Sequence, residues 1–144
     1  MREAIKQEYD YGCGIACFAF ATNQSYRTAA DYLGTKQAQS KRFWCKDFVA
    51  ALNNYGLDYT HHYLTPRLRK RIYQEGTIIL IRRSKHYPAG HYLIRHCGMW
   101  MDPWINLSKD NHMENAQAGF RKRLPGQAMY ALLPGTKTLY ITST

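Results

Sequence analysis

The stretch QEYDYGCGIAC, residues 7–17, joins a short polar turn to an apolar segment that continues to Ala21. Cys13 stands at the junction, directly after Gly12. If the apolar segment is a helix, Cys13 lies in its first turn, where unpaired backbone N–H groups and the positive end of the helix dipole favour a thiolate. We therefore predict a helix that begins at Cys13 and carries this residue as a candidate nucleophile.

Gln7 lies six residues before the candidate nucleophile. Its side-chain amide and the backbone N–H of Cys13 would together supply two donors to an oxyanion, as in the tetrahedral intermediate of acyl transfer. A free cysteine in an apolar helix is more often an inert, buried residue. The catalytic interpretation therefore depends on a base elsewhere in the chain.

The composition favours one folded domain. The chain has 144 residues, 45% of them hydrophobic, with 12 Tyr, 5 Phe and 3 Trp, and this length suffices to bury a core without disulfides or metals. No run approaches the ~20 apolar residues of a membrane span, and the N-terminus lacks the apolar core of a signal peptide. We expect a single cytoplasmic domain over residues 1–144, with a helical part at about 1–56 and a mostly β part at about 57–144.

The four cysteines do not indicate a metal site or a disulfide framework. Cys13, Cys17, Cys45 and Cys97 lack the density of a secreted scaffold and the paired spacing of a zinc site. Cys13 and Cys17 lie one helical turn apart and could share a metal, but no further pair of ligands accompanies them. We expect neither a metal nor a cofactor.

The net charge of +10 suggests an acidic partner. Nucleic acid, an anionic membrane and an acidic polypeptide all fit such a charge, and so does solubility alone. The basic residues are dispersed, and the chain carries no recognisable motif for binding nucleic acid. Composition does not indicate an oligomeric state.

Helices come first in the expected order, followed by mostly antiparallel strands, which is an α+β arrangement. Ser25 and Ser40 are expected to cap two helices that end at Gly34 and Gly56. The expected helices cover residues 13–21, 26–33, 43–55 and a basic segment, 66–75. The expected strands cover residues 57–64, 77–84, 91–95, 99–105, 127–133 and 138–142, with loops at 85–90 and 106–119.

His91 is the best placed of the six histidines. It opens the predicted strand HYLIR, and Asp102 lies on the next strand. If Cys97 and Gly98 are the central residues of a tight turn, the pairing sets His91 opposite Trp104 and projects Asp102 from the same face as His91. The two side chains then become diagonal neighbours, with Cβ atoms on the order of 7 Å apart.

This pair would complete a catalytic arrangement. Asp102 would fix the imidazole tautomer so that the other ring nitrogen of His91 takes the proton of Cys13. That is the nucleophile, base and orienting group of a triad. A strand histidine and an aspartate before Pro103 each have ordinary structural explanations, whereas Gln7, Cys13, His91 and Asp102 taken together favour catalysis.

These residues resemble those of a known family. Gln7 with CGIAC (13–17), then GHYLI (90–94) and MDPW (101–104), are similar to the papain-like cysteine peptidases of the C39 family, the bacteriocin-processing peptidases of bacteria and phage and their stand-alone relatives. The resemblance implies Cys13 as nucleophile, His91 as general base, Asp102 as orienting group and Gln7 as oxyanion donor. It also implies a papain-like fold, in which helices carrying the cysteine pack against an antiparallel sheet carrying the histidine and aspartate.

The leading hypothesis is therefore a stand-alone thiol peptidase, or a related deamidase, that acts on a polypeptide. No transporter domain follows the motifs, so cleavage after a double-glycine leader is not implied. A second hypothesis is a basic, nucleic-acid-binding or toxin-like domain on the same scaffold, and a third is a catalytically inactive adaptor. The basic segment at 66–75 and the run Arg121-Lys122-Arg123 are not explained by the motifs.

Overall fold

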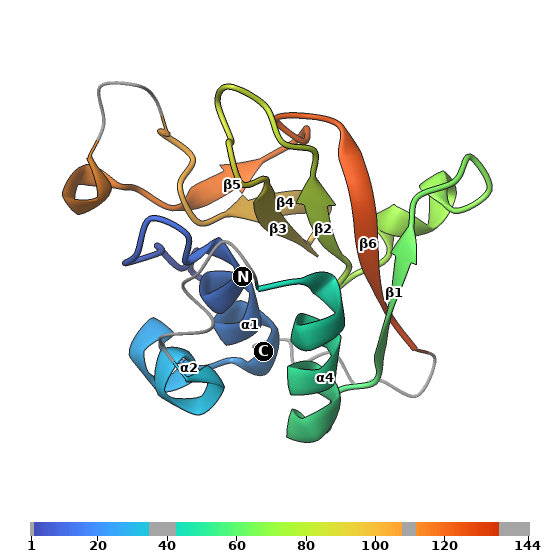
Figure 1. Cartoon of the computed structure of the whole chain (residues 1–144), viewed down its shortest axis with the longest axis horizontal. Helices are drawn as coiled ribbons and strands as arrows, with labels where there is room; N and C mark the ends of the chain where they lie inside the picture. Colours follow the sequence, from blue (N-terminus) through green and yellow to red (C-terminus); the bar gives the residue numbers. More distant parts are fainter. Residues whose placement is uncertain (1, 35–42, 108–111, 136–144) are drawn as a thin grey trace.

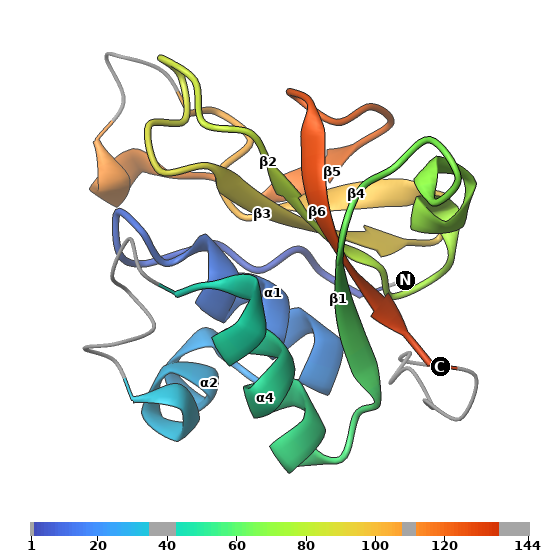
Figure 2. The same ribbon diagram turned by 45° about the vertical axis from the view of Figure 1, so that its right-hand side comes forward.

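A layer of helices covers one face of an antiparallel β-sheet in the computed structural model, which describes residues 2–34, 43–107 and 112–135. Figures 1 and 2 show α1, α2 and α4 gathered on one side of the sheet, with α1 directly against β3. Neither these helices nor any other described here is long and apolar enough to cross a membrane. The predicted α+β class is confirmed.

The helices begin and end close to the predicted residues, with one exception. α1 spans Cys13–Thr22, and α2 spans Tyr26–Leu33 with the Ser25 side chain accepting a hydrogen bond from the Thr28 amide. α4 spans Cys45–Tyr55 and ends at Gly56, whose φ of 103° is left-handed. Its N-cap is Trp44, so α4 begins two residues later than predicted, and Ser40, the predicted cap, lies outside the described residues. Phe43 and Trp44 precede the helix instead of forming its first turn.

Six strands form one sheet in the order β1-β6-β2-β3-β4-β5, and every neighbouring pair is antiparallel. Their bounds are β1 Tyr59–Tyr63, β2 Ile78–Ile81, β3 His91–His96, β4 Met99–Asp102, β5 Gly119–Arg121 and β6 Ala128–Pro134. β5 falls at the end of a segment expected to be a loop. The strand expected at 138–142 lies outside the described residues.

The basic segment after Pro66 is not an α-helix. It forms a short 3-10 helix, η1, over Arg69–Tyr73, and a second one, η2, covers Met113–Asn115. Only Ile72 of η1 is buried. Short helices depend on tertiary packing for their stability. Because only one residue in five is buried here, a longer helix would have too little apolar surface to pack against the core.

The central strands are buried on both faces. Ile78 and Ile94 face the helices, where they join the main core around α1, whereas Ile79 and Leu93 point to the other face. There a second apolar cluster includes Trp100 and is covered by η1 and by the loop before β3. Burial on both sides explains why β2, with the sequence IILI, is a continuous apolar run and does not alternate with polar residues.

The hairpin between β3 and β4 has the predicted register. Ile94 pairs with Met101 and His96 pairs with Met99, so Cys97 and Gly98 are the two turn residues. Their φ values of 50° and 79° are those of a type I′ turn, the tight turn that matches the twist of its strands. The register places His91 and Asp102 on one face, at the end of the hairpin that α1 approaches.

Candidate active site

Cys13 is the first residue of α1 and meets β3 at the start of that strand. Its side chain is mostly buried, and its sulfur accepts a hydrogen bond from the backbone N–H of Tyr92 at 3.4 Å. The N-cap residue Gly12 offers no side-chain oxygen to the first amides of the helix. Those amides therefore face the site together with the positive end of the helix dipole.

His91 and Asp102 form the ion pair expected from the hairpin register. Nε2 of His91 lies 2.7 Å from Oδ1 of Asp102, and both side chains are almost fully buried. Because a carboxylate only accepts hydrogen bonds, Nε2 carries the proton of this bond. The other ring nitrogen, Nδ1, is then left for Cys13, whose side chain contributes to the raised pKa of the imidazole.

The electrostatics of the pair favour its charged form. Burial acts to lower the pKa of His91, but the hydrogen bonds to Asp102 and Cys13 and their charges outweigh it and raise the pKa from 6.5 to about 9. For Asp102, burial acts to raise the pKa, and the bonds from His91, the Trp104 amide and Arg121 lower it below its usual value. At neutral pH the site therefore holds an imidazolium beside a carboxylate.

Two donors besides His91 fix the Asp102 carboxylate. The backbone N–H of Trp104 donates to Oδ1 at 3.0 Å, and the Arg121 guanidinium donates to Oδ2 at 3.0 Å. Arg121 comes from β5, whose residues 119–121 pair with β4. Sequence reasoning missed this contact, and the only sign of it was a basic run at 121–123 that the motifs left unexplained.

Tyr87 packs against the face of the His91 imidazole. Its ring stacks on that of His91, with centroids 4.7 Å apart and planes at 17°. Tyr87 is buried and reaches this position from the loop before β3. Stacking restricts the ring of His91 to the orientation in which one nitrogen meets Asp102 and the other meets the sulfur.

Gln7 lies beside the site, but its amide is directed elsewhere. The side chain is buried, and Nε2 donates to the carbonyls of Tyr9 and Asp10 at 2.9 and 3.2 Å. Both N–H groups of the amide are therefore used within the loop that precedes α1. The backbone N–H of Gln7 donates to the Pro103 carbonyl, which ties this loop to the end of β4.

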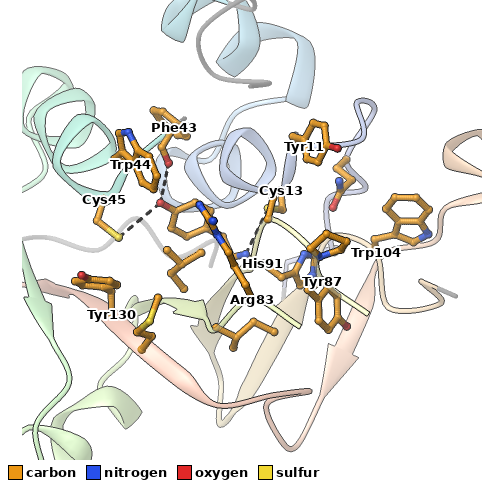
Figure 3. Close-up of a pocket in the computed structure, with 18 of the residues that line it drawn as sticks. Tyr11, Cys13, Phe43, Trp44, Cys45, Arg83, Tyr87, His91, Trp104 and Tyr130 are labelled. Atoms are coloured by element: carbon orange, nitrogen blue, oxygen red, sulfur yellow. Dashed lines mark hydrogen bonds between the residues drawn. The ribbon is translucent and has the colours of Figure 1, made fainter. Parts of the chain in front are cut away.

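A cavity of about 540 Å³ opens onto the sulfur and the imidazole. Figure 3 shows Cys13, His91 and Tyr87 at one end and Trp44, Cys45 and Tyr130 at the other. Most of the wall is aromatic or aliphatic. Two basic residues, Lys46 and Arg83, and two further histidines, His61 and His86, also line it, together with Asp10.

The second cysteine of the motif does not extend the site into a metal centre. Cys17 is fully buried, and burial raises the pKa of its thiol well above the usual value, so it stays protonated. In the parts of the chain that the structure describes, no set of three potential ligands includes Cys13 or Cys17. The arrangement is suited to thiol chemistry, with a sulfur, a base and an orienting carboxylate in sequence.

No protein-family model matches the sequence, and no curated protein matches it either. A solved structure does: the crystal structure of a double glycine motif protease from an AMS/PCAT transporter in complex with the leader peptide. The likeness covers 92% of this chain and 89% of the other, with a TM-score of 0.52 and 16% identity. At this identity the comparison concerns the fold, and it supports the papain-like architecture and the resemblance to C39 peptidases that the motifs indicate.

Proposed function

We propose that this chain is a cysteine peptidase that hydrolyses a peptide bond through Cys13, His91 and Asp102. The observation that carries the proposal is the convergence of these three side chains from two remote segments, the tip of α1 and the β3–β4 hairpin. Cys13 and His91 line one end of a cavity, and the imidazole lies 2.7 Å from the buried carboxylate of Asp102. The fold adds support, because a double glycine motif protease has a similar one.

In the first half of the reaction the Cys13 sulfur attacks the carbonyl carbon of the scissile bond. Before the attack, the proton of this thiol passes to Nδ1 of His91, so that the attacking group is a thiolate and the imidazolium is stabilised by Asp102, whose carboxylate stays ionised. When the tetrahedral intermediate collapses, the C–N bond breaks. His91 then returns the proton to the leaving amine, and the acyl group stays on the sulfur as a thioester.

The second half reverses these roles. Water enters the position that the amine has left, His91 removes a proton from it, and the hydroxide attacks the thioester carbonyl. Collapse of the second tetrahedral intermediate breaks the C–S bond and releases the acid. Arg121 and Trp104 take part in neither half directly; they hold Asp102 in place, and through it the imidazole.

The oxyanion of each intermediate would be stabilised by the backbone N–H of Cys13 at the start of α1. We propose the Gln7 amide as the second donor. For this role one of its N–H groups must leave the carbonyl of Tyr9 or Asp10 and turn to the substrate. The substitution Gln7→Ala then lowers kcat more than it raises KM, by on the order of 10²-fold in kcat.

The cavity favours an extended polypeptide as substrate. Its aromatic wall offers apolar contact, and Lys46 and Arg83 add positive charge that suits acidic side chains in the substrate. The solved structure with a similar fold holds a leader peptide. We extend that substrate class, a peptide, to this chain.

The proposal is tested with a synthetic peptide library that includes sequences with Gly-Gly, with new termini identified by mass spectrometry. The wild-type chain is expected to cleave a subset of peptides, and Cys13→Ala and His91→Ala are expected to abolish cleavage. Cys97→Ser is the matched control, because this thiol is exposed and lies at the far end of the hairpin. Cleavage that survives both site substitutions contradicts the proposal, and release of ammonia without new termini would identify a deamidase.

A further inference from the structure

A second sulfur–imidazole–carboxylate arrangement lies at the other end of the β3–β4 hairpin. Cys97 is the first turn residue and is exposed. Its φ of 50° is left-handed, a conformation in which hairpin turns favour Asn, Asp or Gly. A cysteine in that position presents its thiol at the surface, held on a rigid turn.

Glu75, which precedes β2, forms hydrogen bonds with His96 and with Cys97, the first turn residue. Its Oε2 lies 2.7 Å from Nδ1 of His96, and its Oε1 accepts the backbone N–H of Cys97 at 2.9 Å. His96 is buried against the ring of Phe20, with centroids 5.0 Å apart. The carboxylate and the aromatic contact together fix the imidazole relative to the turn.

The sulfur of Cys97 lies 3.4 Å from Nε2 of the same imidazole. Because the carboxylate of Glu75 can only accept, Nδ1 of His96 carries the proton that points to it. In the neutral ring Nε2 is then the basic nitrogen, and it faces the thiol. The order of groups is that of an activated nucleophile, with a base beside the sulfur and a carboxylate that orients the base.

This geometry fits thiol chemistry better than metal binding. The three residues are the one group of potential ligands close together in the described part of the chain, with ligand atoms within 4.8 Å of one another. The two imidazole nitrogens point in different directions, one to Glu75 and the other to Cys97. A single ion on Nε2 and Sγ would leave the carboxylate behind the ring and would have two protein ligands, fewer than a zinc site uses.

We propose that Cys97 is a reactive surface thiol that exchanges with small-molecule disulfides to form a mixed disulfide. The thiolate attacks one sulfur of R–S–S–R, a Cys97–S–S–R bond forms, and the original S–S bond breaks. The Cys97 sulfur is oxidised and the departing sulfur is reduced to R–S⁻, which takes the proton that His96 received from the thiol. This modification site is independent of the proposed peptidase reaction at Cys13.

The test uses the full chain with Cys13→Ser, so that the other candidate nucleophile is silent. Thiopyridone release from dithiodipyridine, a neutral disulfide, is followed at pH 7, and Cys13→Ser/Cys97→Ser gives the background from the buried thiols. An ordinary cysteine is only a few per cent thiolate at this pH, so we expect Cys97 to react on the order of tenfold faster than a cysteine in an unstructured peptide.

Adding Glu75→Gln tests whether Glu75 acts by orienting His96 or only through its negative charge. Removing a negative charge beside a thiol should raise its rate, whereas loss of the group that orients His96 should lower it, and we expect a fall of at least about fivefold. Glu114→Gln, at an exposed glutamate of η2, is the control and should leave the rate unchanged. His96→Gln is a second probe and should give the same fall. An equal or faster rate in Glu75→Gln, or a rate no higher than that of the unstructured peptide, overturns the proposal.

Discussion

The raised pKa of His91 makes the stability of this protein depend on pH in a defined direction. The folded pKa is about 9 and the ordinary value is 6.5. A group whose pKa is raised by folding stabilises the folded state fully below its unfolded pKa, and that contribution is lost as the pH rises through the folded value. At about 1.4 kcal/mol per pH unit, the interval gives on the order of 3 kcal/mol, present at pH 6 and lost by about pH 9.5.

The assay is urea unfolding of the wild-type chain and of His91→Gln at pH 6 and pH 9.5, in the presence of a reductant. The wild type is expected to lose about 3 kcal/mol more between the two pH values than the variant loses. With an m-value of about 1–3 kcal/mol per molar urea, the excess corresponds to a fall of about 1–3 M in the unfolding midpoint.

The variant is needed because other groups also titrate in this interval. Burial raises the pKa of Cys17 and of Cys45, and unfolding exposes both thiols, which favours the unfolded chain as the pH rises. These contributions are the same in the wild type and in His91→Gln, so the difference between the two reports on His91 together with Cys13, the side chain that faces it. Equal losses in the two proteins would refute the charged imidazolium that the peptidase mechanism requires.

Three further predictions concern the residues around the imidazole. Asp102→Asn should lower kcat on a cleaved peptide by about 10²–10⁴-fold because it removes the group that orients the ring and its charge; a kcat within a few-fold of wild type would contradict this. Arg121→Gln should lower kcat by on the order of tenfold with KM unchanged, since it removes the guanidinium that holds the Asp102 carboxylate in place. The matched control is Arg123→Gln, at an exposed arginine, which should change neither constant. Gly90→Ala should cost about 1–3 kcal/mol in thermal or urea unfolding, because φ is 78° and an added Cβ meets the Ile81 carbonyl at 2.9 Å; an unchanged melting temperature would argue against that strain.

The hairpin that carries the site could be predicted from the sequence because its signals are local. Cys97-Gly98 between two apolar runs indicates a two-residue turn, and the turn fixes the register, which in turn puts His91 and Asp102 on one face. The start of α1 was equally accessible, since a polar turn followed by an apolar run marks a helix end. These two signals specify the elements that the proposed triad needs.

The parts that sequence reasoning missed depend on contacts between remote segments. β5 is three residues long and is a strand because it pairs with β4, so the contact of Arg121 with Asp102 has no local signature. The amide of Gln7 is committed to carbonyls two and three residues along its own loop, which only the folded loop conformation reveals. Likewise η1 is short because only Ile72 finds a core to join, and the pattern of its residues does not disclose that.

The central claim is that the sulfur of Cys13 and the imidazole of His91 share a proton. The most direct test is the rate of Cys13 alkylation by iodoacetamide at pH 6, resolved by peptide mass spectrometry, in the wild type and in His91→Gln. If the claim holds, Cys13 in the wild type reacts at least about tenfold faster than in the variant. The variant lacks the imidazole that accepts the proton of the thiol. Equal rates in the two proteins would show that the thiol and the imidazole act independently, and the proposed peptidase mechanism would be wrong.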